Sequence, residues 1–464
     1  MKPLAESFRP FGTIVENLPA VLHWAFPAFP RVTKLLDGRF SRARVLVLAG
    51  ETGVRMVVEI SQTPLMKGFI YWKRFFCSLI SILLLIGTVA HAAQENEPRG
   101  LPILSPAAKI SLVTCSPGDE LYTAFGHSAI RILDPELGFD RLYNFGTFDM
   151  TVGNFYVRFA RGDLLYQLSV DQGDADIEEH GALGQGVTEA HLNLTTEQKQ
   201  SLFAALETNL APENRYYRYD FLLDNCSTRV RDAFEKIIGT SVADKSVTGV
   251  TFREMLDPYL DRIPWIRFGI YLLLGAGVDR SVQPREACFL PANLESAICQ
   301  TKVSDSAFAQ SPVRLFPVRP LPRMPRALDP EIVFSVILIG WIGLWALRGS
   351  SASRLISALV YIVFGFTGLF LVVLAANTLH WEAYQNGNVA WLVPTHLVAG
   401  IGLIFIPANK LLILRLYLFL AMVEGLVFMV SSPWLPQRFH PAIYPLVVLL
   451  LWRTVIELRR KVAS

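Results

Sequence analysis

Apolar residues are concentrated in the C-terminal third of this chain. Five apolar runs lie there, near Ile332–Leu347, Leu355–Ala376, Val389–Ile406, Leu411–Val430 and Ala442–Leu458. Each is close to the ~20 residues with which an α-helix crosses a bilayer core about 30 Å thick, the first and last only with help from flanking residues. The pattern predicts an all-α bundle of about five transmembrane helices over residues 331–464.

The loops between these runs predict the orientation of the bundle. Positive charges gather on one side, at Arg348, Arg354, Lys410, Arg415, Arg453, Arg459, Arg460 and Lys461. The two loops on the other side, around His380–Asn388 and Ser431–His440, contain only Arg438. Because Lys and Arg accumulate on the cytoplasmic side of a membrane, we expect a multi-pass protein of the bacterial inner membrane with a cytoplasmic C-terminus.

A second apolar segment has the features of a secretory signal peptide. A basic stretch at Lys67–Arg74 precedes an apolar stretch at Phe75–Val89, and Ala90–Ala93 supplies small residues for cleavage. We therefore predict a signal peptide over residues 66–93. Residues 1–65 show no sustained periodicity and are either a cytoplasmic extension or the product of a start assigned too early. The second interpretation is favoured because signal peptides begin within a few residues of the initiator.

Between the signal peptide and the membrane runs, the composition is that of a soluble domain. Residues 100–311 are expected to form an α+β periplasmic domain, and the proline-rich residues 312–330 a linker. Over the whole chain 18% of residues are charged, below the roughly 25% of soluble domains. The formal net charge of +3 argues against a nucleic-acid partner, and the composition excludes a disordered or collagen-like chain.

One cysteine stands at the predicted start of a helix in the soluble domain. Asp224 or Asn225 is suited to cap this helix and Gly239 to end it, which puts Cys226 in the first turn. Four apolar residues share its face of the helix: Val230, Ala233, Phe234 and Ile237. The helix dipole and free N–H groups favour the reactive thiolate there. From spacing alone, a nucleophile and an inert or disulfide-bonded cysteine are equally open.

Two upstream residues are candidates to assist a thiol. His127 opens a predicted strand, and Asn144 lies in the next strand, Arg141–Gly146. An imidazole on a neighbouring strand can take a thiol proton, and a polar group beyond it can fix the tautomer. Taken alone, His127 fits a hydrogen-bonded core histidine better, and Asn144 fits a strand end. Cys115 is a rival nucleophile close to His127, but it precedes a turn and has no helix to activate it.

Several motifs resemble those of the Lnb family, the lipoprotein N-acyltransferases of Bacteroidota: Thr114–Tyr122, Phe125–Arg131, Tyr143–Asp149, Tyr166, Pro212–Phe221 and Asp224–Arg229. Along the chain, a histidine comes first, then a strand with a polar residue, then a helix that begins with Asn-Cys. This order also resembles that of the circularly permuted papain-like fold of the lecithin retinol acyltransferase group. The resemblance is dense over most of Lys109–Pro291. It is looser in the membrane part, where Asn388–His396 is similar to an outer-loop motif but Val393 replaces the expected polar residue.

This resemblance implies a permuted papain-like thiol domain that transfers acyl groups without a cofactor or metal. Cys226 would attack a phospholipid ester, His127 would shuttle the proton and Asn144 would orient the imidazole. The acyl thioester would then acylate the N-terminal amine of a diacylglyceryl-modified lipoprotein at the inner membrane. Arg229 and Arg231 are candidates to meet the phosphate, although surface arginines without such a role are the commoner case.

The remaining polar residues leave further alternatives. Asn388 and His396 are candidates for lipid or substrate contact, while His380 and His396 lack the spacing of a metal site. A Cys288–Cys299 disulfide is permitted outside the cytoplasm, and two free thiols are equally open.

Two other functions compete with acyl transfer. Papain-like folds of this kind also act as cysteine peptidases or amidases on the cell wall, but a soluble polymer gives no reason for five membrane spans. A catalytically inactive membrane scaffold is the third possibility. The presence of Cys226, His127 and Asn144 together makes it less favoured.

Overall fold

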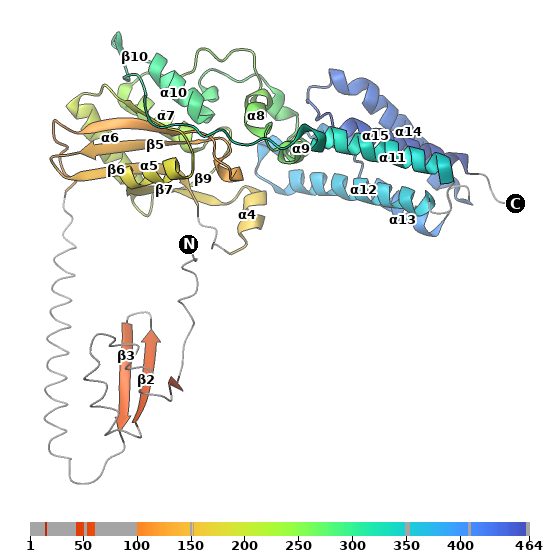
Figure 1. Cartoon of the computed structure of the whole chain (residues 1–464), viewed down its shortest axis with the longest axis horizontal. Helices are drawn as coiled ribbons and strands as arrows, with labels where there is room; N and C mark the ends of the chain where they lie inside the picture. The colour runs from red at the N-terminus through yellow and green to blue at the C-terminus, as the bar shows by residue number, and fades with distance from the viewer. Residues whose placement is uncertain are drawn as a thin grey trace. The chain divides into compact units, whose positions relative to one another are not determined.

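The computed structural model describes residues 14–15, 43–50, 53–60, 100–148, 151, 153–348, 353–406 and 410–460 (Figure 1). The chain divides into two compact units, Met1–Gly100 and Leu101–Ser464. The predicted signal peptide at residues 66–93 lies outside the described residues.

The first unit contains a three-stranded antiparallel sheet. Its strands are β1 (Ile14–Val15), β2 (Ala43–Gly50) and β3 (Gly53–Ile60), in that order. β2 and β3 pair along their whole length, from Ala43 opposite Ile60 to Gly50 opposite Gly53. Periodicity did not predict these strands because they are near-continuous apolar runs rich in valine, without the alternation of a half-exposed strand.

The second unit begins with a seven-stranded antiparallel sheet in the order β12-β8-β4-β5-β6-β7-β9. The strands are β4 (Lys109–Cys115), β5 (His127–Asp134), β6 (Phe139–Thr147), β7 (Leu165–Gln172), β8 (Val187–His191), β9 (Tyr216–Arg218) and β12 (Val313–Phe316). A short hairpin is formed by β10 (Lys302–Val303) and β11 (Ser306–Ala307). Because β12 lies within residues 312–330, the predicted linker begins with an edge strand that pairs with β8.

Seven α-helices accompany this sheet among the described residues. They are α4 (Phe155–Arg161), α5 (Gly173–Ala182), α6 (Thr196–Leu210), α7 (Cys226–Ile238), α8 (Phe252–Leu260), α9 (Pro264–Leu273) and α10 (Pro291–Gln300). α7 packs against β5 and β6, where its Val230 and Phe234 are fully buried beside Ile130 and Tyr143. Burial of each such side chain contributes about 1.5–3 kcal/mol, so the apolar face of α7 fixes Cys226 against the sheet.

In the described part of the membrane region, five further α-helices follow: α11 (Pro330–Arg348), α12 (Ser353–Asn377), α13 (His396–Phe405), α14 (Leu412–Ser431) and α15 (Ile443–Arg459). Among the described residues, Arg354–Asn377 and Leu412–Trp434 are long and apolar enough to cross a membrane. Pro330–Trp345 and His396–Phe405 are shorter apolar helices.

The third predicted span, Val389–Ile406, is not one helix. A short 3₁₀ turn (Gly387–Ala390) comes first, and α13 begins only at His396, because Pro394 disfavours helical geometry just before it. The 10 residues of α13 rise about 15 Å, half the thickness of a bilayer core. α13 packs closely on α12, where a Cβ on Gly400 would meet backbone atoms of α12 at 2.7–2.8 Å.

The loop after α12 joins the membrane helices to the domain that contains the sheet. Trp381 Nε1 donates a hydrogen bond to Asp220 Oδ2 (2.9 Å), and Asn388 Nδ2 donates one to the backbone oxygen of Tyr271 in α9 (3.1 Å). Phe268 of α9 also packs against the apolar core of the membrane helices. The two regions of the second unit therefore share a packed junction.

Candidate active site

Cys226 is the first residue of α7, and the cap predicted for this helix is present. Asn225 Oδ1 accepts from the backbone N–H of Thr228 (3.0 Å), and Asn225 Nδ2 donates to the backbone oxygens of Phe221 and Phe289, both at 2.8 Å. Gly239, with a φ of 67°, ends the helix as predicted. These contacts hold the thiol at the positive end of the helix dipole.

His127 and Asn144 are brought together by the register of β5 and β6. Ala129 lies opposite Asn144, so His127, two residues earlier, faces the same side of the sheet as Asn144. The distance from His127 Nε2 to Asn144 Oδ1 is 3.0 Å. Asn144 Nδ2 in turn donates to Asp171 Oδ2 on β7 at 2.8 Å. A hydrogen-bonded chain thus crosses three neighbouring strands.

The chain of contacts fixes the tautomer of the imidazole. An ionised carboxylate only accepts hydrogen bonds, so Asp171 holds the NH₂ of Asn144 and turns its oxygen toward His127. His127 Nε2 must then donate to that oxygen. This leaves Nδ1 to face the Cys226 side chain, and the interaction with Cys226 is one cause of the raised pKa of His127.

The thiol and the imidazole shift one another toward an ion pair. Burial, the largest influence, raises the pKa of Cys226, but the charge of His127 and hydrogen bonds from His127, the Ser128 backbone and Ser227 outweigh it, and the net pKa is lowered. Burial lowers the pKa of His127, but Cys226 and Asn144 raise it to about 9. A thiolate beside an imidazolium is the reactive form of a cysteine nucleophile.

A glycine and two tyrosines lie close to the Cys226 side chain. Gly146 has a φ of +90°, and a methyl group built on it would lie 3.6 Å from Cys226 Cβ and 3.8 Å from a ring carbon of Tyr219. Tyr219 stacks on Tyr166, with ring centroids 4.2 Å apart. Asp171 was missed from the sequence because its contact depends on strand pairing, whereas Tyr166 and Tyr219 lie in motifs identified from the sequence without a role at the thiol. The motifs around Tyr143–Asp149 and Pro212–Phe221 were the available signal.

The surroundings of Cys115 favour a thiolate less than those of Cys226 do. It pairs directly with His127 across β4 and β5, but it is buried and its pKa is raised, mainly by that burial. Its environment therefore favours the protonated thiol.

The two arginines predicted to meet a phosphate have protein partners instead. Arg229 makes a bidentate ion pair with Asp224 (2.6 and 2.7 Å) and lies over the ring of Tyr217. Arg231 is buried and donates to Asp232 and to the backbone oxygen of Arg285. Both side chains are thus held by groups of the protein.

Asn388 and His396, the two candidates in the membrane region, also make their contacts with other residues of the protein. Asn388 is buried, ties its loop to α9 and accepts from Trp391 Nε1 (3.1 Å). His396 is buried at the start of α13, with Nδ1 at 2.6 Å from the hydroxyl of Tyr417. Neither is brought to the thiol.

The Cys288–Cys299 disulfide predicted as one alternative is absent, and both thiols are free. Cys288 precedes α10 (Pro291–Gln300), whereas Cys299 lies at its far end. The eight helical residues that precede Cys299 in α10 rise about 12 Å, which is beyond the reach of a disulfide.

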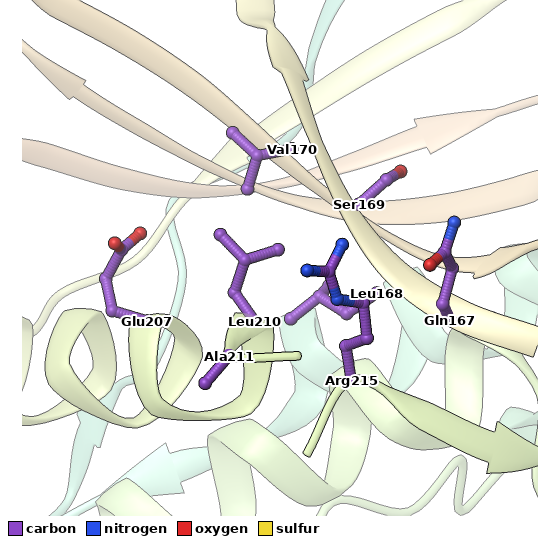
Figure 2. Close-up of a pocket in the computed structure, with 8 residues that line it drawn as sticks. All are labelled: Gln167, Leu168, Ser169, Val170, Glu207, Leu210, Ala211 and Arg215. Atoms are coloured by element: carbon purple, nitrogen blue, oxygen red, sulfur yellow. The ribbon is translucent and has the colours of Figure 1, made fainter. Parts of the chain in front are cut away.

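A pocket of about 530 Å³ lies between β7 and the end of α6 (Figure 2). It is lined by Gln167, Leu168, Ser169, Val170, Glu207, Leu210, Ala211 and Arg215. Figure 2 shows the Arg215 side chain directed toward β7. Because neither the thiol nor the imidazole lines this pocket, it is separate from the Cys226 site.

Comparison with known families agrees with this architecture. Residues 105–258 match the Lnb N-terminal periplasmic domain, and residues 325–463 match the Lnb transmembrane domain. The chain belongs to the Lnb family. Searches of curated proteins and of solved structures found no match.

Membership of the Lnb family confirms the predicted class of fold. An α+β periplasmic domain with a mostly antiparallel sheet is followed by a helical membrane domain, which makes this a membrane-bound protein. Cys226, His127 and Asn144 all lie within the part that matches the Lnb periplasmic domain.

Proposed function

We propose that this protein is a thiol acyltransferase that moves a fatty acyl chain from a phospholipid to the N-terminal amine of diacylglyceryl-modified lipoproteins. The observation that carries the proposal is the Cys226–His127–Asn144 arrangement in a periplasmic domain packed on membrane helices. A lipid ester in the outer leaflet of the inner membrane is a natural substrate for a thiolate held at that position.

In the first half of the reaction, the Cys226 thiolate attacks the ester carbonyl and forms a C–S bond. The oxyanion meets backbone N–H groups of the first turn of α7, which a helix leaves without internal partners. The C–O bond then breaks, and His127 gives its proton to the departing lysophospholipid oxygen. The products are an acyl thioester on Cys226 and a lysophospholipid.

In the second half, the lipoprotein amine attacks the thioester carbonyl. His127, now neutral, takes a proton from the amine, an amide bond forms and the thiolate leaves. Asn144 keeps the imidazole in the same tautomer throughout. A cell-wall peptidase could use the same residues, but the membrane domain favours a lipid donor over a soluble polymer.

The thioester is the test of this proposal. Purified protein is incubated with a phospholipid labelled in its acyl chain, quenched in acid and treated with neutral hydroxylamine. We expect releasable label on the wild type and on Cys115→Ala, and none on Cys226→Ala. His127→Ala should slow labelling by roughly 10²–10⁴-fold, the usual effect of losing a general acid-base group. Label that persists in Cys226→Ala but disappears in Cys115→Ala would assign the chemistry to Cys115.

The acceptor is tested in cells. Mass spectrometry of lipoprotein N-termini, with and without this protein, should show the N-acyl chain only when Cys226 is intact. Unchanged N-acylation in its absence would rule out the proposed acceptor.

We also propose an orientation for the protein in the inner membrane, with the C-terminus in the cytoplasm. Contact of the loop around Trp381 with the periplasmic domain supports it. A reporter fused after Ser464 should be active only in the cytoplasm, and one inserted near Gly387 only outside. The reverse result for either fusion would overturn this orientation.

A further inference from the structure

α4 is a short helix held at the end of a membrane span. It connects β6 to β7 (Figure 1), and its last turn is hydrogen-bonded to the residues that follow α12. Leu379 N donates to the oxygen of Arg161 and Thr378 Oγ1 to that of Ala160, both at 2.8 Å. Because α12 ends at Asn377, these bonds place α4 at the level where that span leaves the lipid.

The surface of α4 is unusually apolar for a helix in water. The side chains of Tyr156, Val157 and Phe159 are 82%, 57% and 50% exposed. Aromatic side chains of this kind gather where lipid meets water, because their rings are apolar and the tyrosine hydroxyl stays solvated. The position and the composition of α4 both point to contact with the bilayer.

A continuous row of aromatic rings leads from α4 to the thiol site. Its members are Phe159, Phe155, Phe148, Tyr166 and Tyr219, with successive ring centroids 6.4, 5.9, 5.3 and 4.2 Å apart. A Cβ built on Gly146 would lie within 4 Å of both the last ring of the row, Tyr219, and Cys226 Cβ. The row therefore leads from the exposed face of α4 to the neighbourhood of Cys226.

We propose that α4 lies in the surface of the outer leaflet and that this aromatic row binds the acyl chain of a phospholipid on its way to Cys226. The inference rests on the proposed acyltransferase function and names the route of its donor. An acyl chain that leaves the bilayer must stay out of water, and the aromatic row offers it successive apolar contacts between α4 and Cys226. The ester carbonyl then reaches the thiolate while the chain remains on the row.

The contact of α4 with lipid is tested by photocrosslinking. The full-length protein carries p-benzoylphenylalanine at Tyr156, or at Leu183 as a control, and is reconstituted in phosphatidylethanolamine–phosphatidylglycerol vesicles with a radiolabelled acyl chain. Leu183 is 65% exposed at the end of α5 and matches Tyr156 in exposure without an anchor to a membrane helix. We expect label at Tyr156 and none at Leu183. Equal labelling of both, or none at Tyr156, would overturn the placement of α4.

The route is tested by comparing two acyl donors, p-nitrophenyl butyrate in solution and dipalmitoyl phospholipid in vesicles. The measured quantity is the rate of hydroxylamine-labile acylation. Phe155→Ser should lower the ratio of the phospholipid rate to the butyrate rate roughly tenfold, because remote apolar contacts bind only the long chain. Phe155→Leu should restore most of the ratio, and Leu183→Ser should leave both rates as in the wild type.

The outcomes separate the route from the function itself. If the wild type forms no thioester with either donor, the proposed function fails. Suppose instead that the wild type forms a thioester with both donors, but Phe155→Ser does not change the ratio of the two acylation rates. The proposed route is then wrong and the proposed function stands, whether or not both rates fall by the same factor.

Discussion

The amide of Asn144 lies between an imidazole and a carboxylate, and these two partners fix its direction. Asp171 takes the NH₂ group and His127 meets the oxygen. Asp171 is thus a positioning residue that acts on the thiol through two other side chains. The same side chain accepts from Ser169 Oγ at 3.3 Å, which further restrains it.

Asp171→Asn tests this positioning role. A neutral amide at this site can accept or donate, so Asn144 can turn its NH₂ toward the imidazole and favour the wrong tautomer. We expect thioester formation to slow by roughly 10–100-fold, as is common when the partner of a functional histidine is lost. Nitrogen NMR of His127 should report the change of tautomer. Asp174→Asn, which alters an exposed carboxylate paired with Arg131, is the control. An equal loss in both variants would speak against a tautomer effect.

The coupled pKa shifts predict how the rate depends on pH. In the reaction that we propose, thioester formation needs Cys226 as the thiolate and His127 as the acid that protonates the leaving oxygen. The pKa of His127 is raised to about 9, so the rate should hold through neutral pH and fall as the imidazolium loses its proton near that value. The measurement is kcat/KM for phospholipid against pH. A rate that keeps rising above pH 9, as for an isolated thiol, would contradict the ion pair.

At the scale of elements, α7 depends on its first turn for both its stability and its chemistry. The Asn225 side chain bonds one N–H of α7 and two carbonyl oxygens of neighbouring segments. Its loss would leave buried polar groups unpaired and would also loosen the residue next to the thiol.

Asn225→Ala should lower the free energy of unfolding by about 1 kcal/mol or more, the usual effect of removing a helix cap. It should also slow alkylation of Cys226 by iodoacetamide at neutral pH. Thr195→Ala removes the equivalent cap of α6, far along the chain from the thiol, and serves as the matched control. Thermal unfolding and alkylation rates are measured on both variants. If Thr195→Ala slows alkylation equally, the effect is one of general stability.

Features set by residues close together in the sequence were predicted better than contacts between distant parts of the chain. The start and end of α7 were predictable because Asn225 and Gly239 act on their own helix. The half-length of α13 was missed because hydropathy does not register the break before His396. Asp171 was missed because its contact with Asn144 exists only when β6 and β7 pair. Strand register is a property of the folded sheet, and one sequence read by periodicity does not supply it.

For the whole molecule, the junction between the periplasmic and membrane regions contains a buried carboxyl group. Glu382, in the loop after α12, is 5% exposed and lies beside Asp220, the residue that binds Trp381. Burial first, and then the charge of Asp220, raise the pKa of Glu382 to about 7. The junction therefore favours the protonated carboxyl.

The sign of this shift predicts a junction that weakens as pH rises. The ordinary pKa of a glutamate is about 4.5, so the folded protein holds an extra proton up to about pH 7, and the stabilisation it brings is lost as pH rises through that value. The melting temperature in detergent should fall between about pH 5 and pH 8. Glutamine stays neutral at every pH, so Glu382→Gln should make the melting temperature fall less over this pH range. Glu286→Gln, at a surface position, should leave the fall as it is in the wild type. An unchanged slope in Glu382→Gln would show that another group is responsible.

The four described thiols differ in protonation, and this bears on how the protein survives outside the cytoplasm. The pKa values of Cys115, Cys288 and Cys299 are all raised, chiefly by burial, whereas that of Cys226 is lowered. Oxidation and disulfide exchange require a thiolate, so three of the four sulfurs are poor partners for either reaction. Cys226, which is 9% exposed, is the one of these four thiols whose pKa is lowered, so we expect it to react first with an oxidant or an alkylating reagent. Cys299 is more exposed, but its raised pKa disfavours the thiolate that such reactions require.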